Sequence, residues 1–546
     1  MCGFHNVLVN IFDIYKNYLI ILKLMGESLM SSWSEGYVSD INYTFGYYSE
    51  LNPNNAIIPF LMAGIALPES ISTSQYNACE LGFGQGISVN VHAAAGHAKW
   101  YATDFNPSQA NFARYLSDVT NNGALIADQG FNEFCKRDDL PEFDFIGLHG
   151  IWSWISDENR AIVVDFIRRK LKVGGILYIS YNTLPGWSAP SPLRHLLLQH
   201  HNTMTAHSNS RQQNIKDSIE FVGKVFAQSP HLTQKSPELL SRVERLKNHD
   251  PHYVAHEYLN KDWQPMYFAD MQKWLESAKL TFACSSNYLD DFHETLYNQE
   301  QREFMAGFSE PSFAQTVKDF ILNKQFRKDF WVKGTRRLNG YEQKQAWKKL
   351  RVLLHTPRKQ IEMKASSHLT VDLNVDLFNP ILDILQDHKI HSVKDIVEVL
   401  KDHFNEMDIF TVLAILAGKN NLVVVQSEEA IEQARPHCEA FNRYVLEQSR
   451  SSQFSINYLA SPITGGAYNL DMVQRWFLLA HIEGLTKKKQ LDFAWSLLKE
   501  NGLFMAEDGK TLEKDEEGKA RMEVIYNGFV ENQLPQLKCL GIISTN

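Results

Sequence analysis

Cysteine pairs with the spacing of a metal site are absent from this sequence. Its six cysteines are scattered along 546 residues, at Cys2, Cys79, Cys135, Cys284, Cys438 and Cys539. Without a CxxC pair, neither a zinc site nor a disulfide framework is indicated. Such cysteine usage suits a reducing compartment. We therefore expect a cytoplasmic protein without a metal centre.

Long hydrophobic runs are missing as well. The apolar stretch at residues 4–24 is interrupted by Asp13, Lys16 and Lys23, whereas a transmembrane helix needs about 18 to 20 consecutive apolar residues. The stretch also has neither the basic start nor the small-residue cleavage site of a signal peptide. We expect no membrane insertion.

Two common catalytic motifs and an excess of positive charge are also lacking. His256 and Glu257 are followed by Asn260, where a zinc protease has its second histidine. Ser153 and Ser180 lack the glycine-flanked elbow of hydrolases. With 54 Lys and Arg against 63 Asp and Glu, the net charge is −9, so the chain as a whole has no general affinity for nucleic acid. We do not expect a nucleic-acid partner.

The most informative feature that is present is a glycine-rich turn. Glu80 ends a short apolar run, Gly82, Gly84 and Gly86 follow at alternate positions, and residues 87–95 read as a helix. Alternating glycines let the backbone approach a ligand and aim the helix amino end at it. The dinucleotide fingerprint is G-x-G-x-x-G; here the third glycine comes one residue early and a carboxylate precedes the first. These departures favour S-adenosylmethionine (SAM), although glycine triplets also occur by chance in loops.

Two further acids follow predicted strands. Lys99–Thr103 ends at Asp104, 24 residues after Glu80, where an α/β nucleotide site places the carboxylate that binds two ribose hydroxyls. The next apolar run ends at Asp128, with Phe131 close behind. Asp128 and Phe131 are either contacts to adenine or a loop acid and a core aromatic residue.

Strands at 144–150 and 175–180 continue the alternation of strand and helix. This alternation predicts an α/β fold with a doubly wound, Rossmann-like parallel sheet. The run from Glu80 to Asp104 within it resembles the class I SAM-dependent methyltransferases.

Other segments narrow the resemblance to bacterial methyltransferases that carry a methyltransferase regulatory domain. They are residues 43–53, 148–154 and 181–187 in the core, and 253–260, 262–265 and 319–327 beyond it. The likeness spans about residues 33–335 and is looser afterwards. It implies SAM as cofactor. Because some members of the family methylate lysines of outer-membrane proteins, it also implies a protein substrate.

The domain organisation expected from these patterns has six parts. Residues 1–32 are a leader or an over-called start, 33–192 the SAM-binding core, and 193–262 a helical cap or a separate helical domain beside the sheet. Residues 263–337 complete the sheet and hold the regulatory segment, 338–375 form a basic connector, and 376–546 form a mainly α domain that is weakly similar to a winged helix. We expect this last domain to serve substrate docking or self-association. The twelve Lys and Arg between Lys324 and Lys359 are either a solvated face or a surface for an acidic partner.

The predicted function is methyl transfer from SAM to a protein lysine. Since the reaction is an in-line displacement, it depends chiefly on alignment. The candidate catalytic residues, taken from strand ends and from the resemblance, are Tyr43, Tyr47, Tyr48, His149, Tyr181 and Asn182. A small-molecule acceptor, or a non-catalytic protein that senses SAM, remain the alternatives.

Overall fold

The computed structural model describes residues 37, 45–73, 75–205 and 210–544. The leader and Tyr43 therefore lie outside the described residues. The chain divides into two compact units, one made of Met1–Tyr43 with Pro190–Trp263, the other of Thr44–Ala189 with Gln264–Asn546.

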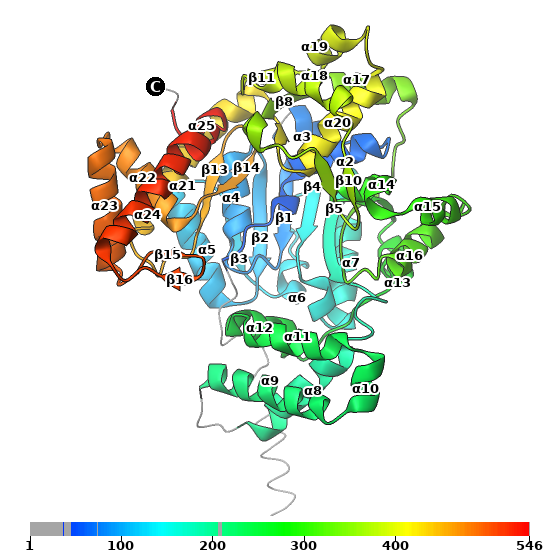
Figure 1. Ribbon diagram of the computed structural model, residues 1–546. Coiled ribbons are helices and arrows are strands. Elements are labelled where there is room, and N and C mark those ends of the chain that lie inside the picture. Colours follow the sequence, from blue (N-terminus) through cyan, green and yellow to red (C-terminus); the bar gives the residue numbers. More distant parts are fainter. Residues whose placement is uncertain (1–36, 38–44, 74, 206–209, 545–546) are drawn as a thin grey trace, which may run out of the picture. The chain divides into compact units, whose positions relative to one another are not determined.

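The larger unit is built on a seven-stranded sheet with the order β3-β2-β1-β4-β5-β7-β6 (Figure 1). The neighbours from β3 to β5 pair in parallel, and β7 is antiparallel to both β5 and β6. The strands are β1 (Asn77–Leu81), β2 (Lys99–Asp104), β3 (Leu125–Asp128), β4 (Phe143–Leu148), β5 (Leu171–Asn182), β6 (Leu280–Ser285) and β7 (Phe326–Lys333). The predicted doubly wound sheet is confirmed.

Both faces of the sheet are covered, as a parallel sheet requires. On one face Ile146 and Leu177 pack with Phe166 and Met271. On the other face Phe145 and other strand residues join a separate core cluster. The helices that follow the strands are α4 (Ile87–Ala95), α5 (Pro107–Thr120), α6 (Phe131–Phe134), α7 (Asp157–Lys170) and α13 (Phe268–Glu276).

Short elements precede β1 and separate β6 from β7. The first group comprises η1 (Ser49–Leu51), η2 (Pro53–Ala56), α2 (Ile57–Met62) and α3 (Glu69–Thr73), and η3 (Trp152–Trp154) follows β4. The second group comprises η4 (Tyr288–Asp291), α14 (His293–Leu296), α15 (Gln299–Met305) and α16 (Pro311–Ile321).

The smaller unit is helical where it is described. Its helices are α8 (Ser191–Met204), α9 (Arg211–Ala227), α10 (Pro230–Lys235), α11 (Glu238–Lys247) and α12 (Pro251–Tyr258). Leu197, Ile219 and Val243 are fully or almost fully buried, and Arg194 donates a hydrogen bond to the carbonyl of Asn260 at 2.5 Å. Whether this unit caps the sheet stays a prediction.

The region after β7 begins with a small mixed subdomain. Its three-stranded antiparallel sheet has the order β11-β8-β12. The elements are α17 (Gly340–Lys348), β8 (Arg351–Leu354), η5 (Arg358–Gln360), β9 (Lys364–Ser366), β10 (Thr370–Asp372), α18 (Val375–Leu385), β11 (Ile390–Ser392), α19 (Val393–Leu400), α20 (Glu406–Gly418) and β12 (Leu422–Val424). Because β8 is the central strand here, the range 338–375 is part of a folded layer.

The remaining residues form a helical layer beside α4 and α5 (Figure 1). It contains α21 (Glu428–Gln448), β13 (Tyr458–Ser461), β14 (Gly466–Asn469), α22 (Met472–Ile482), α23 (Lys487–Glu500), β15 (Ala506–Glu507), β16 (Lys510–Thr511), α24 (Asp515–Gly528), the π-helix η6 (Phe529–Gln533) and α25 (Leu534–Cys539). Val91 and Ala94 of α4 share one core cluster with Phe441 of α21. The expected mainly helical C-terminal region is therefore present, and it packs on the methyltransferase-like core.

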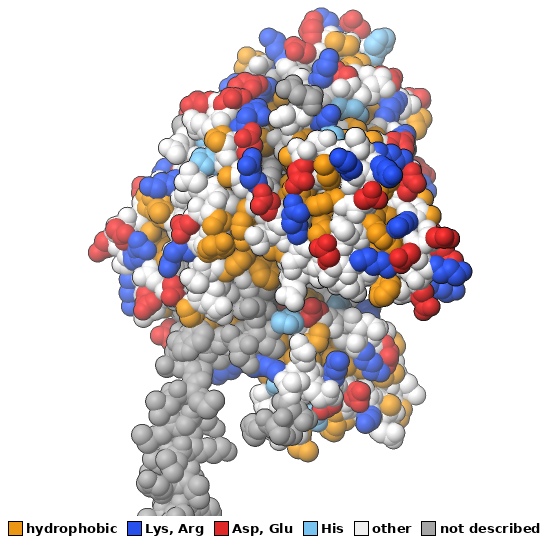
Figure 2. Space-filling model, turned by 90° about the vertical axis from the view of Figure 1, so that its left-hand side faces the viewer, with side chains coloured by type: hydrophobic (Ala, Val, Ile, Leu, Met, Phe, Trp, Pro, Cys, Tyr) orange, Lys and Arg blue, Asp and Glu red, His pale blue; other side chains and the backbone are white. Residues whose placement is uncertain are grey.

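The basic stretch between Lys324 and Lys359 is largely neutralised within the chain. Nine of its cations pair with acids, at positions 324, 327, 328, 336, 344, 348, 351, 358 and 359. On the face drawn in Figure 2, basic and acidic side chains are likewise intermixed. The stretch therefore stabilises the fold more than it offers a surface of one sign.

Candidate functional site: a cofactor loop beside a polar pocket

The glycine turn adopts a conformation that only glycine adopts readily. Gly82, Gly84 and Gly86 have φ angles of +76°, +58° and +71°, in the left-handed region that costs other residues about 1 kcal/mol or more. A Cβ on Gly82 would lie 2.5 Å from Cδ1 of Ile151, and one on Gly86 would lie 2.4 Å from Cβ of Ala113. The turn thus requires glycine, because another residue would strain the backbone and, at Gly82 and Gly86, would clash with its neighbours.

Asp104 holds this turn against the end of β2. Its Oδ2 accepts a hydrogen bond from the Gly84 N–H at 2.9 Å, and its Oδ1 accepts one from the Asn106 N–H at 2.9 Å. Burial nevertheless raises the pKa of Asp104 to about 7, since it outweighs these two hydrogen bonds. Further hydrogen-bond donors, such as those of a ligand, would stabilise its charged form.

Glu80 lies next to this position, at the end of β1. Its side chain is buried, and Oε2 has no hydrogen-bond partner among the described residues. Burial, together with the charge of Asp104, raises the pKa of Glu80 to about 8. A buried acid without a partner is costly, and a cationic or hydrogen-bond-donating ligand would offset that cost. These two acids on a glycine turn therefore fit SAM.

Asp128 and Phe131 lie at the same edge of the sheet. Asp128 is the register partner of Asp104 at the end of β3 and is exposed, while Phe131 begins α6 and is half-buried. Asp128 is therefore adjacent to Asp104 across the strands, and Phe131 follows three residues later. Their contact with adenine stays a prediction.

Of the catalytic candidates, Tyr48 and His149 are brought together. Their rings stack with centroids 3.7 Å apart. The Tyr48 N–H donates to Oγ of Ser88 in α4 at 2.9 Å, and Nδ1 of His149 lies 2.8 Å from the Tyr178 hydroxyl. Burial lowers the pKa of His149 to about 4. At neutral pH the imidazole is therefore uncharged.

The other described candidates, Tyr47, Tyr181 and Asn182, are not part of this stack. The Tyr47 hydroxyl accepts from the Ala467 N–H at 3.1 Å, and the Tyr181 hydroxyl donates to Oδ2 of Asp329 at 3.0 Å. Both hydroxyls hold the fold together. Asn182 is buried at the end of β5, and its amide nitrogen finds no hydrogen-bond partner in the described part of the chain.

Sequence reasoning missed the ion pair beside this stack. The Glu50 carboxylate accepts a hydrogen bond from Nζ of Lys328, 278 residues away in the chain. Glu50 stands in the segment 43–53 that carries the resemblance, but nothing in that segment distinguishes it as a site residue. Lys328 is one of twelve cations in its stretch, and only the pairing of β5 with β7 places it opposite Ser180.

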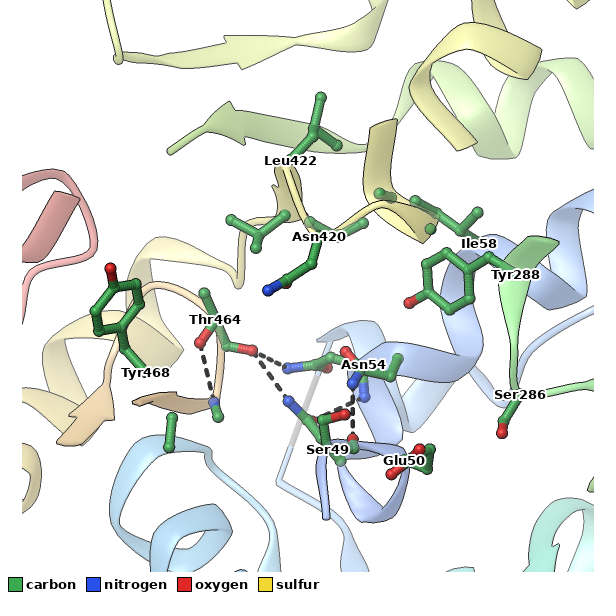
Figure 3. A pocket seen from close by; sticks show the side chains of 18 of the residues that line it. Ser49, Glu50, Asn54, Ile58, Ser286, Tyr288, Asn420, Leu422, Thr464 and Tyr468 are labelled. Atoms are coloured by element: carbon green, nitrogen blue, oxygen red, sulfur yellow. Dashed lines mark hydrogen bonds between the residues drawn. The ribbon is translucent and has the colours of Figure 1, made fainter. Parts of the chain in front are cut away.

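A polar pocket of about 1090 Å³ opens at this place. Its walls come from the segment before α2, from the β6 and β7 edge, from the β8–β12 subdomain and from the β13–β14 hairpin. The Asn54 amide donates to the carbonyl of Thr464 at 3.3 Å and so joins two of these walls (Figure 3). Glu50, Tyr288 and Asn420 face the space between them. Part of the pocket therefore exists only because the C-terminal region is folded onto the core.

The described residues offer neither a metal site nor a membrane-spanning helix. No group of three His, Cys, Asp or Glu there could hold a metal ion. Among the described helices, none is both long and apolar enough to cross a membrane.

Comparison with known proteins places this arrangement in a family. Residues 250–333 match the family model described as a predicted methyltransferase regulatory domain. The uncharacterized protein sll1526 of Synechocystis is 34% identical over 521 residues, which cover 94% of this chain and 100% of that protein. The chain belongs to the same family. The uncharacterized protein RP789 of Rickettsia prowazekii is 25% identical over 61% of this chain and 60% of its own length.

A solved structure shows the same fold. PKMT2 from Rickettsia typhi, in complex with AdoHcy, superposes with a TM-score of 0.65 at 16% identity, over 92% of this chain and 99% of that one. The chain thus has a class I methyltransferase fold with a methyltransferase regulatory domain, as the resemblance predicted.

Proposed function

We propose that this protein is a SAM-dependent methyltransferase whose acceptor is the side chain of a protein lysine. The observation that carries the proposal is the buried side chain of Glu80, whose Oε2 has no hydrogen-bond partner in the described part of the chain, beside Asp104 at the glycine turn. Support for the acceptor comes from the solved relative, a lysine methyltransferase whose structure contains AdoHcy.

The residues of the chain divide the work of such a reaction. SAM, when bound, supplies an electrophilic methyl group. Asp104 would hold the ribose, Glu80 would balance positive charge, and the glycine turn would let the backbone come close. Tyr48 and His149 would orient the acceptor at the ends of β1 and β4, whose register pairs Glu80 with Gly147.

The high pKa of the acceptor ammonium rules out His149 as the catalytic base. A lysine ammonium has an ordinary pKa of about 10.4, whereas the pKa of His149 is lowered to about 4 by burial. A base this weak cannot take that proton to any useful extent. The proton would have to pass to hydroxide or buffer of the bulk solvent before the transfer, and His149 would align the resulting amine.

The lining of the pocket favours a protein over a metabolite. Small-ligand sites are mostly apolar, while this pocket is lined by many amide side chains. Amides can bind the backbone of an extended chain segment. The C-terminal region would then serve substrate docking, while its role in self-association stays a prediction.

A cytoplasmic location is part of the same proposal. The five cysteines within the described ranges, Cys79, Cys135, Cys284, Cys438 and Cys539, are all free. Free thiols of this number are typical of a reducing compartment.

Incubation of the purified protein with radiolabelled SAM and a bacterial lysate tests the proposal. We expect label in the protein fraction and methyllysine after hydrolysis, both lost in Asp104→Ala. The matched control is Glu133→Gln, which changes an exposed acid of α6 and should keep activity. Label in metabolites alone would establish the small-molecule alternative. SAM binding without any transfer would indicate a regulatory protein.

A further inference from the structure

Two carboxylates line the pocket, and each is paired with a lysine of the chain itself. Glu50 is paired with Lys328, and Asp290 with Lys324. Both lysines also line the pocket. Any cation that enters therefore meets acids that already have a partner.

The Asp290 pair is built into the fold. Besides Lys324 at 2.9 Å, its carboxylate accepts hydrogen bonds from Asn287 at 2.9 Å and from Ser367 at 3.0 Å. Its side chain is 4% exposed. With so many donors, this acid has no need of an external cation.

The Glu50 pair is held much less firmly. Lys328 is the one side chain in the described residues that donates to the Glu50 carboxylate, and Glu50 and Lys328 are 19% and 38% exposed. The four-carbon stem of a lysine is flexible. Its ammonium can therefore leave Glu50 without breaking a wider network.

The Glu50 pair also lies where an acceptor would have to lie. Tyr48, two residues earlier, stacks on His149 at the end of β4, and Lys328 is opposite Ser180 near the end of β5. Ligands of open α/β sheets bind outside the carboxyl ends of the strands. Glu50 is thus the weakly held carboxylate beside the expected methyl-transfer position.

We propose that Glu50 receives the ammonium group of the acceptor lysine, and that Lys328 is an internal stand-in which the acceptor displaces. The inference rests on the proposed function, since it names the group that selects lysine at the same site. One ammonium replaces another at a single carboxylate, so the exchange creates no unpaired buried charge. A neutral or acidic side chain cannot make this exchange, and selectivity for a cationic acceptor follows.

Binding of two fluorescent heptapeptides tests this exchange without any methyl transfer. One peptide carries a central lysine and the other the uncharged isostere norleucine, and fluorescence anisotropy gives Kd for each. Lys328→Met removes the competing ammonium group but keeps an unbranched side chain of similar length. Lys324→Met is the matched control at the Asp290 pair. Glu50→Gln removes the proposed receptor.

In Lys328→Met we expect the preference for the lysine peptide over the norleucine peptide to rise about tenfold. The peptide ammonium then forms its charge-assisted hydrogen bond to Glu50 without competition from Lys328. Lys324→Met should leave it unchanged, and in Glu50→Gln the two peptides should bind alike. An unchanged preference in Lys328→Met, or no measurable binding of the lysine peptide at millimolar concentration, would overturn the inference. Because this experiment measures binding and not turnover, its outcome is independent of the lysate assay that tests the proposed function.

Discussion

Replacement of Glu80 by glutamine should change both the stability of the protein and the way it binds its cofactor. In the folded chain the pKa of Glu80 is raised to about 8 by burial and by the charge of Asp104. In the unfolded chain it would have its ordinary value of 4.5. The folded state therefore binds more protons than the unfolded state between these values.

The size of the effect follows from linkage. The free energy of unfolding of the unit that contains Glu80 should fall as the pH rises from about 4.5 to about 8. At pH 7, with 1.36 kcal/mol for each pH unit above 4.5, Glu80 lowers that free energy by about 3 kcal/mol relative to acid pH. Glu80→Gln stays neutral in both states, so this part of the pH dependence should disappear.

Cofactor binding should show the opposite trend. A cation prefers the charged carboxylate, so SAM must displace the proton that Glu80 holds at neutral pH. The affinity of the wild-type protein for SAM should rise by up to about tenfold per pH unit between pH 6 and pH 8. In Glu80→Gln the affinity should be lower and the rise shallower by one proton.

Calorimetry in buffers of different ionisation enthalpy counts the protons released on SAM binding. Thermal denaturation from pH 5 to pH 8 follows stability, with Glu133→Gln as control. Equal proton release by the wild-type protein and Glu80→Gln would refute the assignment of Glu80 to the cofactor. Identical pH profiles of stability would refute the assignment of its raised pKa.

Three other changes test separate parts of the site. Gly82→Ala should abolish SAM binding, measured by calorimetry, because the added Cβ would clash with Ile151. The control Gly123→Ala has a similar φ of +74° and nothing within 4 Å of the added Cβ, so it should keep SAM binding and lose only about 1 kcal/mol of stability, measured by thermal melting. Normal SAM binding by Gly82→Ala would show that the packing against Ile151 is irrelevant to the cofactor. Tyr48→Leu should lower the rate of methyl transfer at least tenfold with little change in SAM affinity, because it removes the stack on His149; an unchanged kcat would place the acceptor elsewhere. A chain that ends at residue 375 should be insoluble or unfolded by circular dichroism, since it exposes the core that α4 shares with α21; a stable truncated protein that binds SAM would show that the core folds alone.

The sequence predicted those parts of the fold whose signals are local. Each of the first five strands contains a short apolar run, and the acids Glu80 and Asp104 lie at or next to the ends of two of them. In a parallel sheet such ends meet at one edge, so the spacing along the chain translates into proximity in space. The proximity of Glu80 and Asp104 at the glycine turn could therefore be predicted from the sequence.

The acceptor side could not be inferred in this way. The pairing of Glu50 with Lys328 depends on the antiparallel register of β7 against β5. The Tyr47 hydroxyl reaches Ala467, 420 residues away. No periodicity or spacing encodes such distant contacts. Tyr47 was therefore predicted as a catalytic candidate, because the sequence does not show that its hydroxyl binds Ala467.

Helix α4 links these two sides of the molecule physically. Its amino end follows the glycine turn, and its residue Ser88 positions the backbone of Tyr48. Its carboxyl end accepts a hydrogen bond from Gln426 at the Ala95 carbonyl, at 2.8 Å. The same Gln426 side chain accepts a hydrogen bond from Asn54, at 3.2 Å, on the pocket wall. Because one rigid helix carries contacts to the cofactor turn, to the aromatic stack and to the C-terminal region, a change in that region can alter catalysis without touching SAM.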